Sequence, residues 1–356
     1  MNNIKNIFYV LCVFWLSGCA SESMEFTTAK TALRSEKDFV RAEEWLKKAL
    51  KADTTDAMVA YVYATEILKP QKRYKKMASM LDLASQRNPN QKIETPFMWE
   101  DKPILIVKDG VQAYKEQEWT VVYNSAIDYY QNSDLDKAIE LLETALLFLP
   151  NDGGTYGTLG ALYIEKKDFD KAGIVIKKGL NLDSNNATLL EISATYFVQT
   201  KDLVNAESTL IKALNLSKNP GNILRQLVFV QIDLEKYESA IEYSLQALRD
   251  FPNDPDIYYN VAVLYQKMGI IRFDSARDQY LKISNEENKN KEQLNSIYSE
   301  FKESRTFFVD SKDYFLTVTD LNPDDEISYD AVKEIKKMLK QLDELFIPSV
   351  RDMIEK

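Results

Sequence analysis

The sequence predicts an all-α solenoid of about seven stacked helix-turn-helix units, with an enlarged last unit and a C-terminal capping helix. Small or compact residues recur every 34 positions, at Ala126, Gly160, Ala194, Val228 and Ala262. A mostly aromatic column has the same spacing: Tyr129, Tyr163, Phe197, Gln231 and Tyr265. Two more columns are small in every row, namely Ala138, Ala172, Ala206 and Ala240, then Ala145, Gly179, Ala213 and Ala247. This pattern indicates helix pairs, because small residues let two helices touch while large ones fill the space between units.

The spacing within each unit resembles the tetratricopeptide repeat (TPR). The fit is best in one unit, at Tyr156, Leu159, Gly160, Tyr163, Ala172, Ile176 and Gly179. Two other units end on a Pro-Asn helix stop, at Pro150 and Pro252. The resemblance covers most of residues 24–345 and implies a helical scaffold that binds proteins or extended segments.

We divide the chain into six segments. These are a processing segment (1–19), N-terminal units (20–90), an insert (91–118), four regular units (119–254), an enlarged unit (255–324), and a capping helix with its tail (325–356). We expect the first helix to begin near Met24–Thr28. In the insert, the apolar stretches 96–99 and 103–107 contain prolines, so we expect a loop packed on the solenoid, then a helix from about Asp109. The alternative is a flap that closes one end of the groove.

The enlarged seventh unit permits two registers. In the first, Ala262 pairs with Ser311, and the helices form a protruding antiparallel pair because apolar residues continue at helical spacing past Tyr265. In the second, a helix begins at Ala276 and residues 291–318 form a separate helix. A final helix from Glu326 to about Leu345 would cap the solenoid, and we expect residues 347–356 to be loose.

The N-terminus predicts a lipid anchor. Lys5 precedes an apolar run from Ile7 to Leu16 that is too short to span a bilayer comfortably. Residues 16–19, Leu-Ser-Gly-Cys, resemble a bacterial lipobox, and the resemblance implies cleavage before Cys19 and acylation of its thiol. The alternative is an ordinary secretory signal. Ala20 after the cysteine implies, by the enterobacterial sorting pattern, an outer-membrane protein of the cell envelope that faces the periplasm.

Composition argues against several kinds of chemistry. The chain has no histidine, so Ser-His-Asp and Cys-His catalysis and most zinc chemistry are excluded. We therefore expect no enzyme activity, no cofactor and no metal. The net charge of −10 argues against a nucleic-acid partner. The basic cluster at residues 72–76 is interpreted as a solvated helix face.

The resemblance places a partner-binding surface on the concave face, lined by the first helix of each unit. The residues predicted there are Tyr123, Ile127, Tyr130, Glu165, Glu191, Thr195, Gln199, Arg225, Phe229, Tyr259 and Asn260. Arg225 is the only cation among them, so a clamp of several Lys and Arg residues for a C-terminal carboxylate is not supported. Aromatic and amide side chains suit an extended polypeptide, although the same aromatics could fill the space between repeats.

Three functions are compatible with this reading. The first is a non-enzymatic, lipid-anchored scaffold that binds a protein partner in a cell-envelope assembly. The second is an outer-membrane lipoprotein that captures glycans or nutrients, and the third is an accessory subunit of a cell-wall enzyme complex. An enzyme with a repeat appendage would need a catalytic domain of at least ~100 residues. The longest stretch outside the repeats, 91–118, is too short for one.

Overall fold

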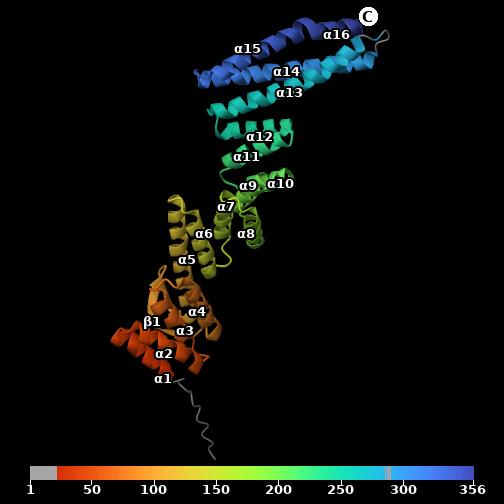
Figure 1. Cartoon of the computed structure of the whole chain (residues 1–356). Helices are drawn as coiled ribbons and strands as arrows, with labels where there is room; N and C mark the ends of the chain where they lie inside the picture. Colours follow the sequence, from red (N-terminus) through yellow and green to blue (C-terminus); the bar gives the residue numbers. More distant parts are fainter. Residues whose placement is uncertain (1–21, 285, 287–289) are drawn as a thin grey trace, which may run out of the picture. The chain divides into compact units, whose positions relative to one another are not determined.

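The computed structural model describes residues 22–284, 286 and 290–356. The described chain is an α-helical solenoid with seven helix pairs (Figure 1). Contacts divide it into two compact units, one up to Asn151 and one from Asp152. The six-segment division of the sequence stays a prediction, and the processing segment 1–19 with Cys19 lies outside the described residues.

The first unit contains three helix pairs and a β-hairpin. The first pair is α1 (Met24–Thr31), continued by the π-helical η1 (Ala32–Glu36), with α2 (Phe39–Ala52). The second is α3 (Ala57–Val62), continued by η2 (Tyr63–Leu68), with α4 (Tyr74–Arg87). Strands β1 (Lys92–Trp99) and β2 (Lys102–Ile106) follow, then α5 (Val107–Gln131) and α6 (Leu135–Phe148). The predicted helix start near Met24 is confirmed.

The second unit continues the repeats and ends in a helical cap. Its regular pairs are α7 (Gly153–Glu165) with α8 (Phe169–Leu182), α9 (Ala187–Gln199) with α10 (Leu203–Leu216), and α11 (Gly221–Asp233) with α12 (Tyr237–Asp250). The long pair is α13 (Pro255–Ser284) with α14 (Lys291–Leu321), which run side by side in Figure 1. The cap is α15 (Glu326–Gln341), η3 (Leu342–Phe346) and α16 (Ile347–Glu355).

The turn inside each regular pair repeats the same local chemistry. One residue adopts a left-handed conformation, as at Ser133, Lys167 and Lys201, with φ between 61° and 64°. The next residue is an aspartate whose side chain accepts a hydrogen bond from the backbone three residues on, which caps the second helix. In the sixth pair Lys236 replaces the aspartate, and no side chain caps α12. The repeat is therefore encoded in its turns as well as in its packing.

The small columns lie where paired helices cross. Ala126, Ala138, Ala172 and Ala194 are fully buried. The crossing of α7 with α8 is the tightest case, because a Cβ added at Gly160 would lie 2.7 Å from Cγ1 of Ile176. Only a residue without a side chain fits at this point, since real Cβ atoms do not approach a neighbour so closely.

Buried serines fix the register of the seventh pair. The Ser311 hydroxyl donates to the carbonyl of Ala262 at 2.7 Å, and the Ser304 hydroxyl donates to the carbonyl of Gly269 at 2.8 Å. Helix α13 also runs without interruption from Pro255 to Ser284. The structure therefore has the register in which Ala262 faces Ser311. The alternative register, with a new helix at Ala276, is wrong.

The insert forms a β-hairpin, so the predicted loop is wrong. Phe97 pairs with Ile104 and Trp99 with Lys102 in an antiparallel register. The turn residues Glu100 and Asp101 both have positive φ, of 46° and 61°, which matches the twist of a two-residue hairpin. The next helix begins at Val107, two residues earlier than predicted. It needs no side-chain cap there because the first backbone N–H groups donate to the carbonyls of Gln91 and Pro89.

The C-terminal tail is helical, and the expectation that residues 347–356 are loose is wrong. Helix α16 spans Ile347–Glu355, and Val350 is fully buried. Just before it, Phe346 packs against Phe273 and Phe301 with ring centroids 5.2 Å and 5.0 Å away. This aromatic cluster holds the end of the chain because its burial removes large apolar surfaces from water.

The basic cluster at residues 72–76 is partly engaged in ion pairs. Arg73 donates to Glu43 at 2.8 Å, and Lys76 donates to the hydroxyl of Tyr63 at 2.6 Å. Burial would raise the pKa of Glu43, but hydrogen bonds from Lys47, Arg73 and Tyr63 outweigh it and lower that pKa to about 2. The cluster thus joins α2 to α4 while its cations stay at least partly solvated.

Among residues 22–356 as described, no helix is both long enough and apolar enough to cross a membrane.

We predict that Gly160→Leu destabilises the second unit by about 1–3 kcal/mol or more, because the new side chain would force α7 away from Ile176. Gly154→Leu is the matched control in the same helix. A Cβ there would meet only an Asp152 carboxylate oxygen at 3.4 Å. Denaturant unfolding followed by circular dichroism measures both variants, and equal stabilities would contradict the crossing argument.

Candidate functional site

A hollow of about 400 Å³ lies in the second unit between the first helices of two successive repeats. Helix α11 contributes Arg225 and Phe229, and the start of α13 contributes Tyr259 and Asn260. Ser244 and Ala247 of α12 form part of the wall. Helices α11 and α13 are the first helices of successive pairs, so the hollow lies along the row of helices on which the sequence predicts a binding surface.

The side chain of Arg225 is positioned by contacts with Asp254 and Phe251. Its Nη2 atom lies 3.0 Å from Oδ2 of Asp254, and its guanidinium lies 5.8 Å from the ring centroid of Phe251. Asp254 itself receives the backbone N–H of Asp256 at 3.0 Å. The positive charge of Arg225 is therefore partly balanced by Asp254, while its side chain is still 54% exposed.

Aromatic and amide side chains supply the remaining contacts. Tyr259 packs edge-on against Phe315 of α14, with centroids 5.6 Å apart and planes at 78°. Phe229, in contrast, is 62% exposed although it stands in the middle of α11. A phenyl ring left in water at such a place is a ready apolar contact for a ligand. Asn260 offers both a donor and an acceptor for a polypeptide backbone.

A second hollow, of about 370 Å³, adjoins the first through Phe229. It is lined by Thr195 and Val198 of α9 and by Gln226, Val230 and Asp233 of α11, together with Phe229 itself. Because Phe229 lines both hollows, they are neighbours, and its exposed ring stands between them. An extended segment could occupy both hollows at once.

The charge around these hollows is negative. Asp233 and Asp256 line the hollows alongside the Arg225–Asp254 pair. Glu191 lies one helical turn before Thr195 on α9, and burial raises the pKa of its carboxyl. No neighbouring cation is among the causes of that shift. Of these carboxylates, those of Asp233 and Asp256 line the hollows themselves.

The structure brings together part of the predicted surface. Arg225, Phe229, Tyr259 and Asn260 line one hollow, and Thr195 joins Phe229 in the next. The other predicted residues line neither hollow. Glu191 is half-buried, and Gln199 and Glu165 are exposed near the ends of their helices.

Three predicted residues belong to the first unit. Tyr123 stacks on Trp119 with centroids 5.2 Å apart and packs beside the N-terminal core. For this residue the interpretation as repeat packing therefore fits better than the interpretation as a contact surface. Ile127 is half-buried and Tyr130 is 40% exposed. The hollows described above are confined to the second unit.

Sequence reasoning missed the acidic side of the site. Asp254 and Asp256 lie just before and within the first turn of α13, and Asp233 ends α11. A signal was present, since the run Pro-Asn-Asp-Pro-Asp at residues 252–256 combines a helix stop with a helix start. Such residues are usually caps, and only the fold places their carboxylates beside Arg225.

Nothing in the site points to metal chemistry. Over the part of the chain that the structure describes, no group of three or more Cys, Asp or Glu side chains is placed to hold a metal ion. The predicted lipid-attachment residue, Cys19, lies outside that part.

Comparison with known proteins supports the repeat. The family model described as the tetratricopeptide repeat matches residues 154–186, which cover α7 and α8. No curated protein sequence matches the chain. The fold is thus the one that protein-interaction scaffolds of the TPR class use, and the predicted all-α solenoid is confirmed.

Several solved structures are similar in part. The chain is 21% identical to pilF of Pseudomonas aeruginosa, with 63% of this chain and 99% of that chain covered and a TM-score of 0.41. For MamA of Desulfovibrio magneticus the identity is 13%, the coverage 59% and 97%, and the TM-score 0.42. For YrrB, described as a TPR protein with an unusual peptide-binding site, the values are 17%, 54% and 97%, and 0.35. With TM-scores of 0.35 to 0.42, these similarities say nothing about function.

We predict that Glu191→Gln leaves the second unit as stable as before at neutral pH, or more stable by up to about 1 kcal/mol. Burial raises the folded-state pKa of Glu191, so the stability this group contributes is fully present below its unfolded pKa and is lost as the pH rises through the folded pKa. The glutamine stays neutral and avoids that loss.

Glu207→Gln is the matched control. Glu207 pairs with Lys236 at 2.7 Å, and hydrogen bonds from that lysine lower its pKa. Its loss should therefore destabilise the unit at neutral pH, by about 1 kcal/mol, and the effect should fade in acid. Denaturant melts at neutral and acidic pH measure both variants. A marked loss of stability in Glu191→Gln at neutral pH would show an unrecognised cationic partner.

Proposed function

We propose that this protein is a non-enzymatic scaffold of the bacterial cell envelope. Acylation of Cys19 anchors it in the outer membrane, where it faces the periplasm, and the groove between α9 and α13 binds an extended segment of a protein partner. The observation that carries the proposal is the pair of hollows joined at the exposed ring of Phe229.

The chemistry of the groove indicates what kind of segment fits. An exposed aromatic ring and apolar walls favour an aromatic or aliphatic anchor side chain. Asn260 suits the hydrogen-bonding groups of an extended backbone. The carboxylates of Asp233 and Asp256, which line the two hollows, favour lysine or arginine beside the anchor. We therefore propose a segment that carries both an apolar anchor and positive charge.

The membrane half of the proposal rests on the N-terminal motif. The lipobox-like residues 16–19 follow an apolar run, and they end only a few residues before α1 begins at Met24. Several acyl chains on one residue hold a protein at a bilayer far more firmly than one chain does. A short tether keeps the folded chain close to that bilayer.

We predict that Cys19→Ser releases the protein from membranes or leaves it uncleaved, because the serine hydroxyl cannot accept the lipid. Cell fractionation and the mass of the N-terminal peptide provide the measurement. Cys12→Ser is the control, since Cys12 lies in the segment that cleavage would remove. A Cys19→Ser protein that is still cleaved and membrane-bound would refute the anchor.

For the groove, we predict that a photo-crosslinking amino acid at position 229 captures a protein partner in intact cells. The same probe at Val204 of α10, which is 67% exposed but lines neither hollow, should not capture it. Phe229 is preferable to Arg225 as a test position because Arg225 already pairs with Asp254.

A second variant, Asn260→Ala, tests whether the crosslink depends on the hollow. Asn260→Ala in the background of the position-229 probe should reduce the crosslinked product, while the helical melt is retained. Peptides selected on the purified protein should be enriched in lysine or arginine next to an aromatic or aliphatic residue. Selection of acidic peptides, or equal crosslinking at positions 229 and 204, would contradict the proposal.

A further inference from the structure

The β-hairpin of the first unit has one exposed apolar face. Met98 of β1 lies opposite Pro103 of β2, and both are exposed, Met98 by 62% of its surface. Leu105, two residues beyond Pro103 and so on the same face, is 51% exposed. Pro96 is also exposed, but the strand register shifts between Lys92 and Phe97, so alternation does not fix its face. We call Met98, Pro103 and Leu105 the outer apolar face.

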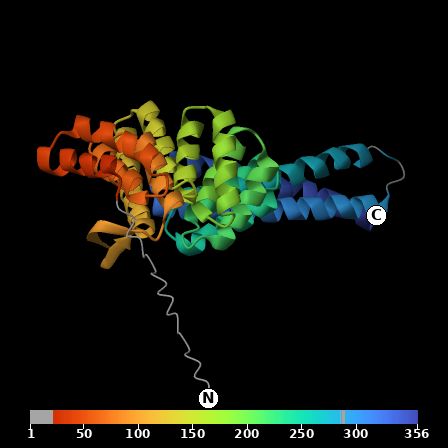
Figure 2. The ribbon, with the colours of Figure 1, turned by 90° about the horizontal axis from the view of Figure 1, so that it is seen from below.

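The opposite face of the hairpin is fixed to the helices. Ile104 is buried, and the ring of Phe97 packs on Tyr114 of α5 with centroids 5.4 Å apart. The indole N–H of Trp99 donates to Glu116 of the same helix at 3.4 Å. In Figure 2 the hairpin projects beyond the helices of its unit. The outer apolar face is therefore held outward by a firmly packed inner face.

The two prolines limit what can cover this hairpin. Proline has no backbone N–H to donate, so Pro96 on β1 and Pro103 on β2 each weaken the strand edge at which a further strand could pair. Addition of a partner's strand is disfavoured at both edges. Whatever covers this hairpin is therefore expected to contact the side chains of the outer apolar face and not to pair with a strand edge.

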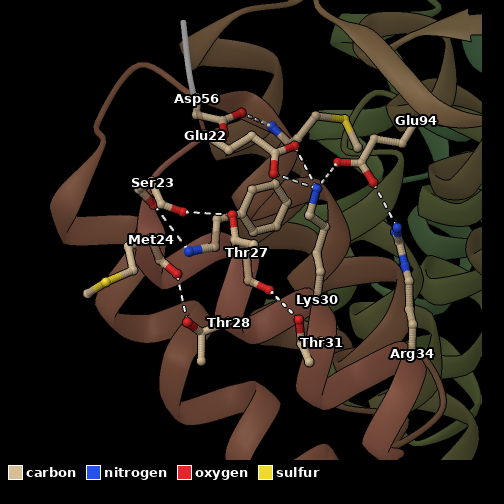
Figure 3. A network of polar contacts seen from close by, with 12 residues as sticks. Glu22, Ser23, Met24, Thr27, Thr28, Lys30, Thr31, Arg34, Asp56 and Glu94 are labelled. Atoms are coloured by element: carbon tan, nitrogen blue, oxygen red, sulfur yellow. Dashed lines mark hydrogen bonds and ion pairs between the residues drawn. The ribbon is translucent and has the colours of Figure 1, made fainter.

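A polar network joins the hairpin to the start of the first helix (Figure 3). The ammonium of Lys30 lies 2.6 Å from Glu22 and 2.8 Å from Glu94 of β1. Arg34 binds the other oxygen of Glu94 at 2.8 Å. Because Glu22 and Glu94 share one ammonium, residue 22 lies beside the first half of β1.

This network holds Glu22, which follows Cys19 in the chain, close to the hairpin. Cys19 precedes Glu22 by three residues, and three residues span at most about 10 Å. From Glu94 to Met98 the strand advances by roughly 13 Å. An acyl group on Cys19 would thus place a bilayer within reach of the outer apolar face. Lys30 and Arg34 also pair with the carboxylate of Glu94.

We infer that the outer apolar face lies on the lipid bilayer and is a second membrane contact beside the acyl anchor. This inference rests on the proposed acylation of Cys19. Three apolar side chains on a hairpin cannot hold a protein at a membrane alone, but next to an acyl anchor they fix the orientation of the first unit. The contact is apolar, so it does not require anionic lipid and persists at high salt.

The experiment uses the acylated protein with Met98→Cys, labelled with an environment-sensitive fluorophore. Cys12 is removed and Cys19 is blocked in the mature protein, so the new thiol is unique. The protein is reconstituted in vesicles of phosphatidylcholine and phosphatidylethanolamine. We expect a blue shift of the emission and quenching by lipids that carry a nitroxide near the headgroup. Val204→Cys, on an equally exposed apolar position of α10, should show neither.

The outcomes separate this inference from the anchor. If the protein floats with the vesicles and its N-terminal peptide has the acyl mass, but the label at position 98 reports water, the hairpin contact is refuted and the anchor stands. If neither acylation nor flotation is found, the anchor fails and this inference fails with it. A blue shift at position 98 that lipid nitroxides do not quench would show that a protein covers the face, which also overturns the inference.

Discussion

The close crossing of paired helices is the constraint on which the rest of this structure depends. At Gly160 no Cβ fits beside Ile176, and at Ala262 the second helix approaches closely enough for Ser311 to bind a backbone carbonyl. Such crossings fix how each pair packs, and successive pairs then stack with their first helices lining one surface. The hollows beside Phe229 exist because α9, α11 and α13 are successive members of that row.

The site combines a balanced ion pair with unbalanced carboxylates. Arg225 is the only cation of the predicted surface, and it pairs with Asp254. In contrast to Asp254, the half-buried Glu191 has its pKa raised by burial, and no cation is among the causes of that shift. The proposed ligand, apolar and cationic, follows from the carboxylates that line the hollows and the exposed ring of Phe229, and it differs from the ligand of a clamp for a terminal carboxylate.

Part of the fold was predictable because its determinants are local or periodic. The helix pairs followed from columns 34 residues apart. The left-handed residue and the Asp cap in each turn came from the structure. The hairpin was not predicted, because its turn uses Glu100 and Asp101 where glycine or asparagine is usual, and prolines stand in both strands. The helical tail was missed because Val350 and Phe346 are held by an aromatic cluster from distant helices.

The sequence by itself determined the class of the molecule, the position of its helix pairs and the absence of histidine chemistry, because composition and period are properties of the chain alone. Only the tertiary structure decided which predicted residues share a hollow. It placed Asp254 against Arg225 and left Phe229 in water, and it joined Glu22 to β1 through Lys30. The physical reason is that charge balance, exposure and cavity shape depend on neighbours far apart in the sequence, which periodicity does not specify.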